Sequence, residues 1–223
     1  MKKVLILILV LVVQTTFAQV TKNIGDFNTI KVFDKLNVKL ISSSENKAII
    51  TGDREDEVEF VNNNGELKIR MPFPKLLSGN DISIKLYFKN IDGIAASEGS
   101  YISSDGVFKE TILDLNVREG AEINLELDGT KKVNVKAVSG GIIELSGNAV
   151  NQDVVIMSGG VLKAKDLQTS QTSINVSAGG NAEINASVLV DAKVKAGGAI
   201  YVYGKPEQIN KETLFGGKII EKN

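Results

Sequence analysis

Acidic residues are the first candidates for chemistry in this sequence, because two carboxylates that face each other across a sugar can hydrolyse a glycosidic bond. The candidates alternate with aliphatic residues in short segments and are Asp114, Glu122, Glu126 and Glu144. Alternation places them on the solvent side of strands, where charged side chains commonly lie. No two of them are spaced to share one turn of chain beside an arginine. The sequence therefore predicts no catalytic residue and no enzyme.

Two pairs of residues near the C-terminus are the best candidates for binding. Tyr201 and Tyr203 lie two positions apart and should share one face of a strand, as should Lys193 and Lys195. Aromatic rings with cations nearby can hold a sugar. Tyrosine is also favoured in strands for reasons of packing alone. These four residues predict a carbohydrate or peptide contact on the last turns of the chain.

The absent residue types restrict the chemistry further. The 223-residue chain has no His and no Cys, so the usual general base, the thiol nucleophile and the common zinc ligands are missing. An acidic cluster between Asp53 and Glu59 offers oxygens to a hard cation, but Arg54 lies inside it and the spacing is not that of an EF-hand. The cluster is interpreted as a solvated turn. The sequence predicts no metal site and no cofactor.

The elements that would position these residues follow from an internal repeat. Seven segments align on a glycine, each followed by aliphatic residues, at intervals of 18 to 21 residues. Glycine adopts a positive φ without steric cost, so each glycine would turn the chain sharply between two strands. The structural glycines are Gly99, Gly120, Gly141, Gly160, Gly180, Gly198 and Gly217.

Alternating strands precede these glycines. Leu113 to Val117 and Val133 to Ala137, for example, place aliphatic residues on one side and polar residues on the other. A repeat with two or three such strands cannot bury its apolar side alone, but parallel stacking of successive turns encloses one continuous core. The sequence therefore predicts an all-β fold, a single-stranded parallel β-helix (solenoid) over residues 91–223.

The N-terminal third contains strands but lacks the repeat. Segments such as 67–71 and 82–86 alternate, and a single helical turn is expected from Arg54 to Val61. A solenoid exposes an apolar cross-section at each end. Residues 19–90 are therefore interpreted as an N-terminal β region that covers one end of the stack, with residues 19–223 forming one structural domain.

The first 18 residues are typical of a secretory signal peptide. Lys2 and Lys3 precede an aliphatic run from Val4 to Val13, and Ala18 offers a small residue for cleavage. The run is about half as long as a membrane-spanning helix. We expect export to the periplasm, the cell surface or the medium, with no integral membrane segment after cleavage. The remaining chain has 24 Lys and Arg residues against 27 Asp and Glu residues, and no basic stripe that would predict nucleic acid binding.

Four segments carry a family resemblance. Residues 24–30 (IGDFNTI), 38–40 (VKL), 49–53 (IITGD) and 65–69 (GELKI), in that order, resemble the opening of the head GIN domain family of putative autotransporter adhesins. The later Ser-Gly-Gly repeats resemble the body of that family, so the resemblance covers about residues 24–205. It implies an exported β-helical domain with an adhesive or surface role. It brings no catalytic residues with it.

The first functional hypothesis is an exported, non-catalytic, adhesin-like interaction module that offers a flat face of the solenoid to a glycan or a surface protein. A polysaccharide-processing enzyme on a pectinase-like β-helix and a structural envelope protein are the alternatives. A groove lined by two convergent carboxylates with Arg or Lys would favour the enzyme. A flat face of mixed Asn, Lys and Thr would favour the interaction module.

Overall fold

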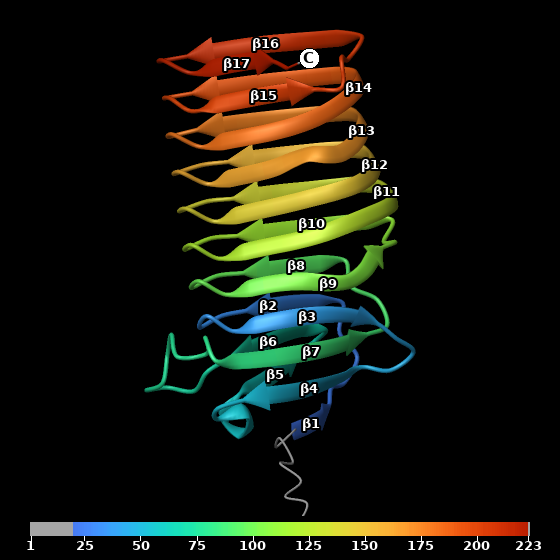
Figure 1. Cartoon of the computed structure of the whole chain (residues 1–223), viewed down its shortest axis with the longest axis vertical. Helices are drawn as coiled ribbons and strands as arrows, with labels where there is room; N and C mark the ends of the chain where they lie inside the picture. The colour runs from blue at the N-terminus through green and yellow to red at the C-terminus, as the bar shows by residue number, and fades with distance from the viewer. Residues whose placement is uncertain (1–19, 223) are drawn as a thin grey trace, which may run out of the picture.

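The structure is a computed structural model that describes residues 20–222, and it is a stack of flattened β-coils (Figure 1). The expected signal peptide, residues 1–18, lies outside the described residues. The first nine strands are β1 (Val20–Asn23), β2 (Thr29–Val32), β3 (Asn37–Ser42), β4 (Lys47–Gly52), β5 (Glu59–Asn63), β6 (Glu66–Arg70), β7 (Ile82–Phe88), β8 (Gly93–Ala96) and β9 (Tyr101–Phe108). The others are β10 (Ile112–Val117), β11 (Glu122–Ala137), β12 (Ile142–Ile156), β13 (Val161–Ser177), β14 (Asn181–Lys195), β15 (Ala199–Tyr203), β16 (Gln208–Leu214) and β17 (Lys218–Glu221).

Each coil contributes one strand to each of two faces. Face A consists, in spatial order, of β1, β4, β7, β3, β9, the first halves of β11 to β14, β15 and β17. Face B consists of β5, β6, β2, β8, β10, the second halves of β11 to β14, and β16. Pairing is parallel throughout the stack except at its N-terminal end, where β1, β4 and β5 pair antiparallel with their neighbours. The predicted parallel β-solenoid with an N-terminal β region at one end is confirmed.

The core lies between the two faces. Alternation turns every second side chain inward, as in β11, where Ile123 and Leu125 of face A and Val133 and Val135 of face B are at most 3% exposed. Residues at the same register in successive coils stack, so the buried aliphatic side chains form continuous columns along the axis. The outward positions of the same strands carry charged and amide side chains, which are the surface available for function.

The N-terminal coils are not stacked in chain order. The coil formed by β2 and β3 lies between the coil of β6 and β7 and the coil of β8 and β9, because β2 pairs with both β6 and β8 (Figure 1). Parallel pairing therefore runs across residue 90, so residues on both sides of that position share one stack. The expected helical turn from Arg54 to Val61 is shorter: a 3-10 turn, η1, covers Glu55–Glu57, and β5 begins at Glu59.

The glycine corners connect face B to face A, and at the corner of Gly159 and Gly160 the two glycines serve different needs. Ser158 and Gly159 both have positive φ values, 51° and 74°, which turn the chain. Gly160 does not, but a Cβ atom there would lie 2.3 Å from the carbonyl oxygen of Ala137 in the preceding coil. The first glycine therefore provides the turn, and the second allows the coils to approach.

Because the turn position and the close-approach position are different residues, the sequence-based alignment of the seven glycines is wrong by one residue in two repeats. Gly99 and Gly120 have φ values of 70° and 69° and occupy the first glycine position, not the second. Ser100 and Ala121 stand at the second position, and both are buried. The second position tolerates these small residues in the early coils, whereas from Gly141 onward it is glycine.

The C-terminal coil ends the stack with polar residues at inward positions. Lys211 of β16 pairs in register with buried Ala192, and Glu221 of β17 with buried Val202. Lys211 and Glu221 form an ion pair with each other across the open end of the core. Inward-pointing charges at an exposed sheet edge prevent further strands from adding there. No helix within residues 20–222 has the length and apolar character needed to cross a membrane.

Candidate functional site at the bulge in β13

The outward surface of face A is irregular at one place, in the first half of β13. Lys163 is in register with Glu144 of β12 on one side and with Glu183 of β14 on the other. Beyond Lys163 the register shifts, and Asp166 rather than Lys165 stands opposite Ser146. An extra residue of this kind is a β-bulge, which locally disrupts the ladder and re-aims side chains.

The bulge breaks the alternation of buried and exposed side chains. Lys165 and Asp166 are consecutive and both exposed, while Ala164 and Leu167 on either side of them are fully buried. Two neighbouring polar side chains therefore point outward where a regular strand would present one. The surface beside them is hollowed.

This hollow has a volume of about 300 Å³ and is lined mostly by charged and amide side chains. Its lining residues are Asn124, Glu144, Leu145, Ser146, Lys163, Lys165, Asp166 and Glu183. The Nζ atom of Lys163 lies 3.4 Å from Oε2 of Glu144, and both side chains are about half exposed. An exposed ion pair of this kind is weak, at most about 1 kcal/mol, so a ligand can compete for both groups.

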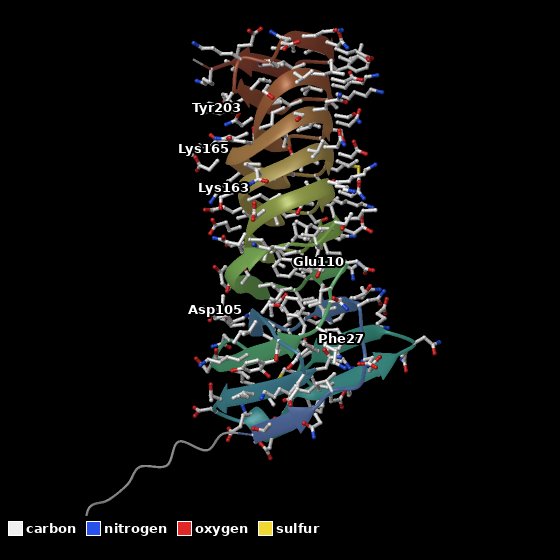
Figure 2. The ribbon with its side chains drawn as sticks, turned by 90° about the vertical axis from the view of Figure 1, so that its right-hand side faces the viewer. Phe27, Asp105, Glu110, Lys163, Lys165 and Tyr203 are labelled. Carbon is white, nitrogen blue, oxygen red and sulfur yellow. The ribbon has the colours of Figure 1, made fainter. Side chains whose placement is uncertain are left out.

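The two predicted tyrosines lie on the coil next to the hollow. Tyr201 of β15 is in register with Glu183, and Tyr203 with Asn185, so both rings are on the outward side of face A. The Nζ atom of Lys222 lies 5.1 Å from the centroid of the Tyr201 ring. Lys163, Lys165 and Tyr203 project from the same side of the stack (Figure 2). The hollow together with Tyr201 and Tyr203 is called the bulge site below.

The two predicted lysines lie elsewhere. Lys193 and Lys195 belong to the second half of β14, which pairs with β16 on face B. Lys193 lies 3.3 Å from a carboxylate oxygen of Glu212 on the next strand. The structure thus separates the predicted tyrosine pair from the predicted lysine pair and places Lys163 and Lys165 on the tyrosine side instead.

The four acidic candidates are also dispersed. Asp114 is on face B, and Glu122 and Glu126 are on face A outside the hollow, so that only Glu144 lines it. Asp166 and Glu183 join Glu144 there, and sequence reasoning missed both. The signal for the first was present: the run Lys163-Ala164-Lys165-Asp166-Leu167 departs from strict alternation, which marks a bulge.

The chemistry that the bulge site offers is hydrogen bonding and stacking. Carboxylates accept hydrogen bonds, lysine ammonium groups donate them, and tyrosine rings present apolar faces with a polar hydroxyl at the edge. Among residues 20–222, no group of three or more His, Cys, Asp or Glu side chains is arranged to hold a metal ion. The bulge site is therefore a polar hollow with two tyrosine rings beside it.

Comparison with known proteins gives one family and several similar folds. A family model described as "Putative auto-transporter adhesin, head GIN domain" matches residues 26–206. No curated protein sequence matches the chain.

Solved structures from Bacteroidota share the fold across nearly their whole length. A structure from Bacteroides fragilis described as a putative adhesin has 18% identity and a TM-score of 0.84, with 94% of this chain and 98% of that chain covered. A putative adhesin from Parabacteroides merdae has 19% identity and a TM-score of 0.72, covering 92% and 96%. A structure from Parabacteroides distasonis described as a putative lipid binding protein has 17% identity and a TM-score of 0.65, covering 92% and 97%. At these identities the likeness establishes the fold alone, and the names differ on one fold.

Proposed function

The chain belongs to the head GIN domain family, and on that premise we propose that it is an exported, adhesin-like interaction module that binds a glycan or a surface protein through the bulge site. The family description and the names of two similar structures support the adhesive role. The signal-like segment of residues 1–18 supports export to the periplasm or the cell surface.

One observation carries the choice of site: the register places Tyr201 and Tyr203 on the coil adjoining a hollow that contains lysines and carboxylates. Ligand sites combine apolar surface with a few polar groups that fix orientation. A sugar ring resting on a tyrosine would bring its hydroxyl groups to Lys163 and Glu183. We therefore take a glycan as the ligand to test first.

A second candidate function has its own observation. Glu144, Asp166 and Glu183 line one hollow together with Lys163 and Lys165, and this is the grouping that a polysaccharide-processing enzyme would use. The non-catalytic function is preferred because none of the charged side chains that line the hollow is buried, so water is not excluded from a bound substrate.

The experiment is a glycan-array screen with the mature protein, followed by calorimetry on the strongest ligand. An aromatic contact is worth about 0.5–1.5 kcal/mol, so Tyr201→Ala and Tyr203→Ala should each weaken binding about three- to tenfold. Tyr101→Ala is the matched control, because Tyr101 points outward on face A at β9, and the strands of β11, β12, β13 and β14 separate it from Tyr201 and Tyr203 on β15. Equal affinity for all three variants would remove the bulge site from the proposal.

The same ligand decides between the two candidate functions. An interaction module leaves the oligosaccharide intact after prolonged incubation, as judged by reducing-end assay and mass spectrometry. Release of products that is abolished by Glu144→Gln or Glu183→Gln would establish the enzyme and reject the non-catalytic proposal.

A further inference from the structure

Face B carries a slot that follows from two small residues. Along this face the outward positions of β8 are Gly93 and Ala95, whereas the neighbouring strands carry Lys31 and Asp114 at outward positions. Because β8 offers nothing longer than a methyl group, the surface sinks between β2 and β10. The hollow continues from β8 over β10 to β11 and β12, where Val135, Lys136 and Val155 also line it, and it has a volume of about 450 Å³. Adjacent strands are about 4.8 Å apart, so Lys31 of β2 and Asn116 of β10, which flank Ala95 in register, stand about 10 Å from each other across β8.

The slot continues toward the glycine corners. A second hollow of about 180 Å³ shares Lys31, Ala95 and Asn116 with the first and extends it to Phe33 and Arg118. The two hollows together follow the whole of β8. They form a trough whose floor at β8 is Gly93 and Ala95, and on the side of β10 the trough extends to β11 and β12.

Charge is distributed unequally along this trough. At the Gly93 end the nearby side chains are Asp114 and Asp153, and at the other end they are Lys31, Lys136 and Arg118. Lys31 is committed to Glu66 at 2.6 Å, whereas the Arg118 guanidinium is only loosely paired, 3.8 Å from Glu119. Within residues 20–222 Lys136 has no carboxylate within 4.0 Å. Two cations at one end are therefore available to an anion.

We propose that the slot over β8 is a second binding site, independent of the bulge site, and that it takes a linear oligosaccharide bearing carboxylate groups. The sugar ring lies over Gly93 and Ala95. Its carboxylate is bound by Lys136 and Arg118. Its hydroxyl groups form hydrogen bonds with Asp114, beside Gly93, and with Asn116, beside Ala95.

A peptide fits the same trough less well. Both edges of β8 are hydrogen-bonded, to β2 on one side and β10 on the other, so β8 cannot accept a further strand. A peptide lying in the trough would cover its own N–H and C=O groups against a floor of Gly93 and Ala95, which supplies no partners. Unpaired buried backbone groups are costly, whereas sugar hydroxyl groups project sideways to the walls.

The test is calorimetric titration of the mature protein with three probes: a short oligogalacturonate, the same oligosaccharide fully methyl-esterified, and an oligoglutamate of similar length. The oligogalacturonate should bind. The ester keeps the sugar skeleton but loses the charge, and the oligoglutamate keeps the charge but loses the sugar. Each should bind at least about tenfold more weakly, as expected when charge-assisted hydrogen bonds or the fit to the trough are lost.

Matched variants locate the binding. Ala95→Leu fills the trough from an outward position and should lower affinity at least about tenfold, and Lys136→Ala should lower it about three- to tenfold. Asn175→Leu makes a similar change at an exposed outward position of β13 on face B, outside the slot, and should leave affinity unchanged, as should Tyr201→Ala on face A. Absence of oligogalacturonate binding, equal binding of oligoglutamate, or full binding by Ala95→Leu would each overturn the proposal without touching the bulge site.

Discussion

The two glycines of one corner should respond differently to the same substitution, and Gly159 and Gly160 in the middle of the stack provide the comparison. At Gly159 the φ value is 74°, and a Cβ atom would meet no heavy atom within 4 Å. The cost of Gly159→Ala is therefore backbone strain alone, about 1–2 kcal/mol. The loss of freedom in the unfolded chain offsets about 0.4–1 kcal/mol of it. We expect a decrease of about 1 kcal/mol in the free energy of unfolding.

Gly160→Ala meets the preceding coil instead. The added Cβ atom would lie 2.3 Å from the carbonyl oxygen of Ala137 and 2.6 Å from its carbon. That oxygen accepts the backbone hydrogen bond of Met157 at 3.0 Å, which joins the two coils. Relief of the contact must separate the coils and weaken this bond. Overpacking costs about 1–3 kcal/mol and a backbone hydrogen bond about 1 kcal/mol, so we expect a decrease of about 3 kcal/mol.

Urea denaturation followed by far-UV circular dichroism measures both values. Lys163→Val, at an exposed outward position, is the control and should stay within about 0.5 kcal/mol of wild type. Gly217 lies in the terminal coil, where an added Cβ atom would be 2.2 Å from Cγ1 of Val194 in β14, so Gly217→Ala should cause local fraying instead of a full loss. If Gly159→Ala proved as costly as Gly160→Ala, or if Gly160→Ala were harmless, the close approach of coils at the corners would be refuted.

Four further predictions concern a buried aspartate, a glutamate with a raised pKa, the C-terminal end of the stack and the N-terminus of the mature chain. Buried Asp34 accepts two backbone N–H bonds from the loop between β6 and β7, so Asp34→Ala should lower the free energy of unfolding by about 3 kcal/mol in urea titrations. Burial, together with Asp34 nearby, raises the pKa of Glu98, so the folded state favours the protonated carboxyl group. The wild-type protein should therefore lose stability relative to Glu98→Gln as the pH rises from about 4 to 7. A stability difference that does not change with pH would contradict this. Replacing Lys211 and Glu221 together by Leu should make the C-terminal end apolar and produce end-to-end association that light scattering detects, whereas the wild-type protein should not associate through that end. Mass spectrometry of protein from its native host should find a chain that starts at or near Gln19, not at the initiator methionine.

Most of the fold could be predicted because its determinants are periodic. Alternation in segments such as Val133 to Ala137 indicates half-buried strands, and the glycine intervals indicate stacked turns. The order of the N-terminal coils could not be predicted, because β2 pairs with β6 and β8 through contacts that no local pattern encodes. The alignment at Gly99 was wrong by one residue for a related reason. In later coils both the residue that turns the chain and the residue that allows the coils to approach are glycine, so the sequence alone does not show that Gly99 is the turn residue, whereas its φ value does.

The candidate site was less accessible to sequence reasoning. Strand alternation with a period of two residues correctly places Tyr201 and Tyr203 on the same side of their strand. It does not indicate whether a given strand belongs to face A or to face B. Lys193 and Lys195 therefore proved to be on the other face. The residues that line the hollow beside the tyrosines come from earlier coils, and Asp166 faces outward there only because of a bulge. The slot over β8 depends on the absence of side chains at Gly93 and Ala95, which has meaning only once the neighbouring strands are known.

One NMR titration tests the central claim most directly, because it observes the protein and the ligand together. The mature protein is titrated with the strongest uncharged ligand of the glycan array, which lacks the carboxylate groups proposed for the slot over β8, while backbone amide shifts and ligand signals are recorded. The account predicts shifts confined to the segments around Lys163–Asp166 and Tyr201–Tyr203, with the ligand spectrum chemically unchanged at the end. Shifts centred on any other surface, or conversion of the ligand into products, would contradict it.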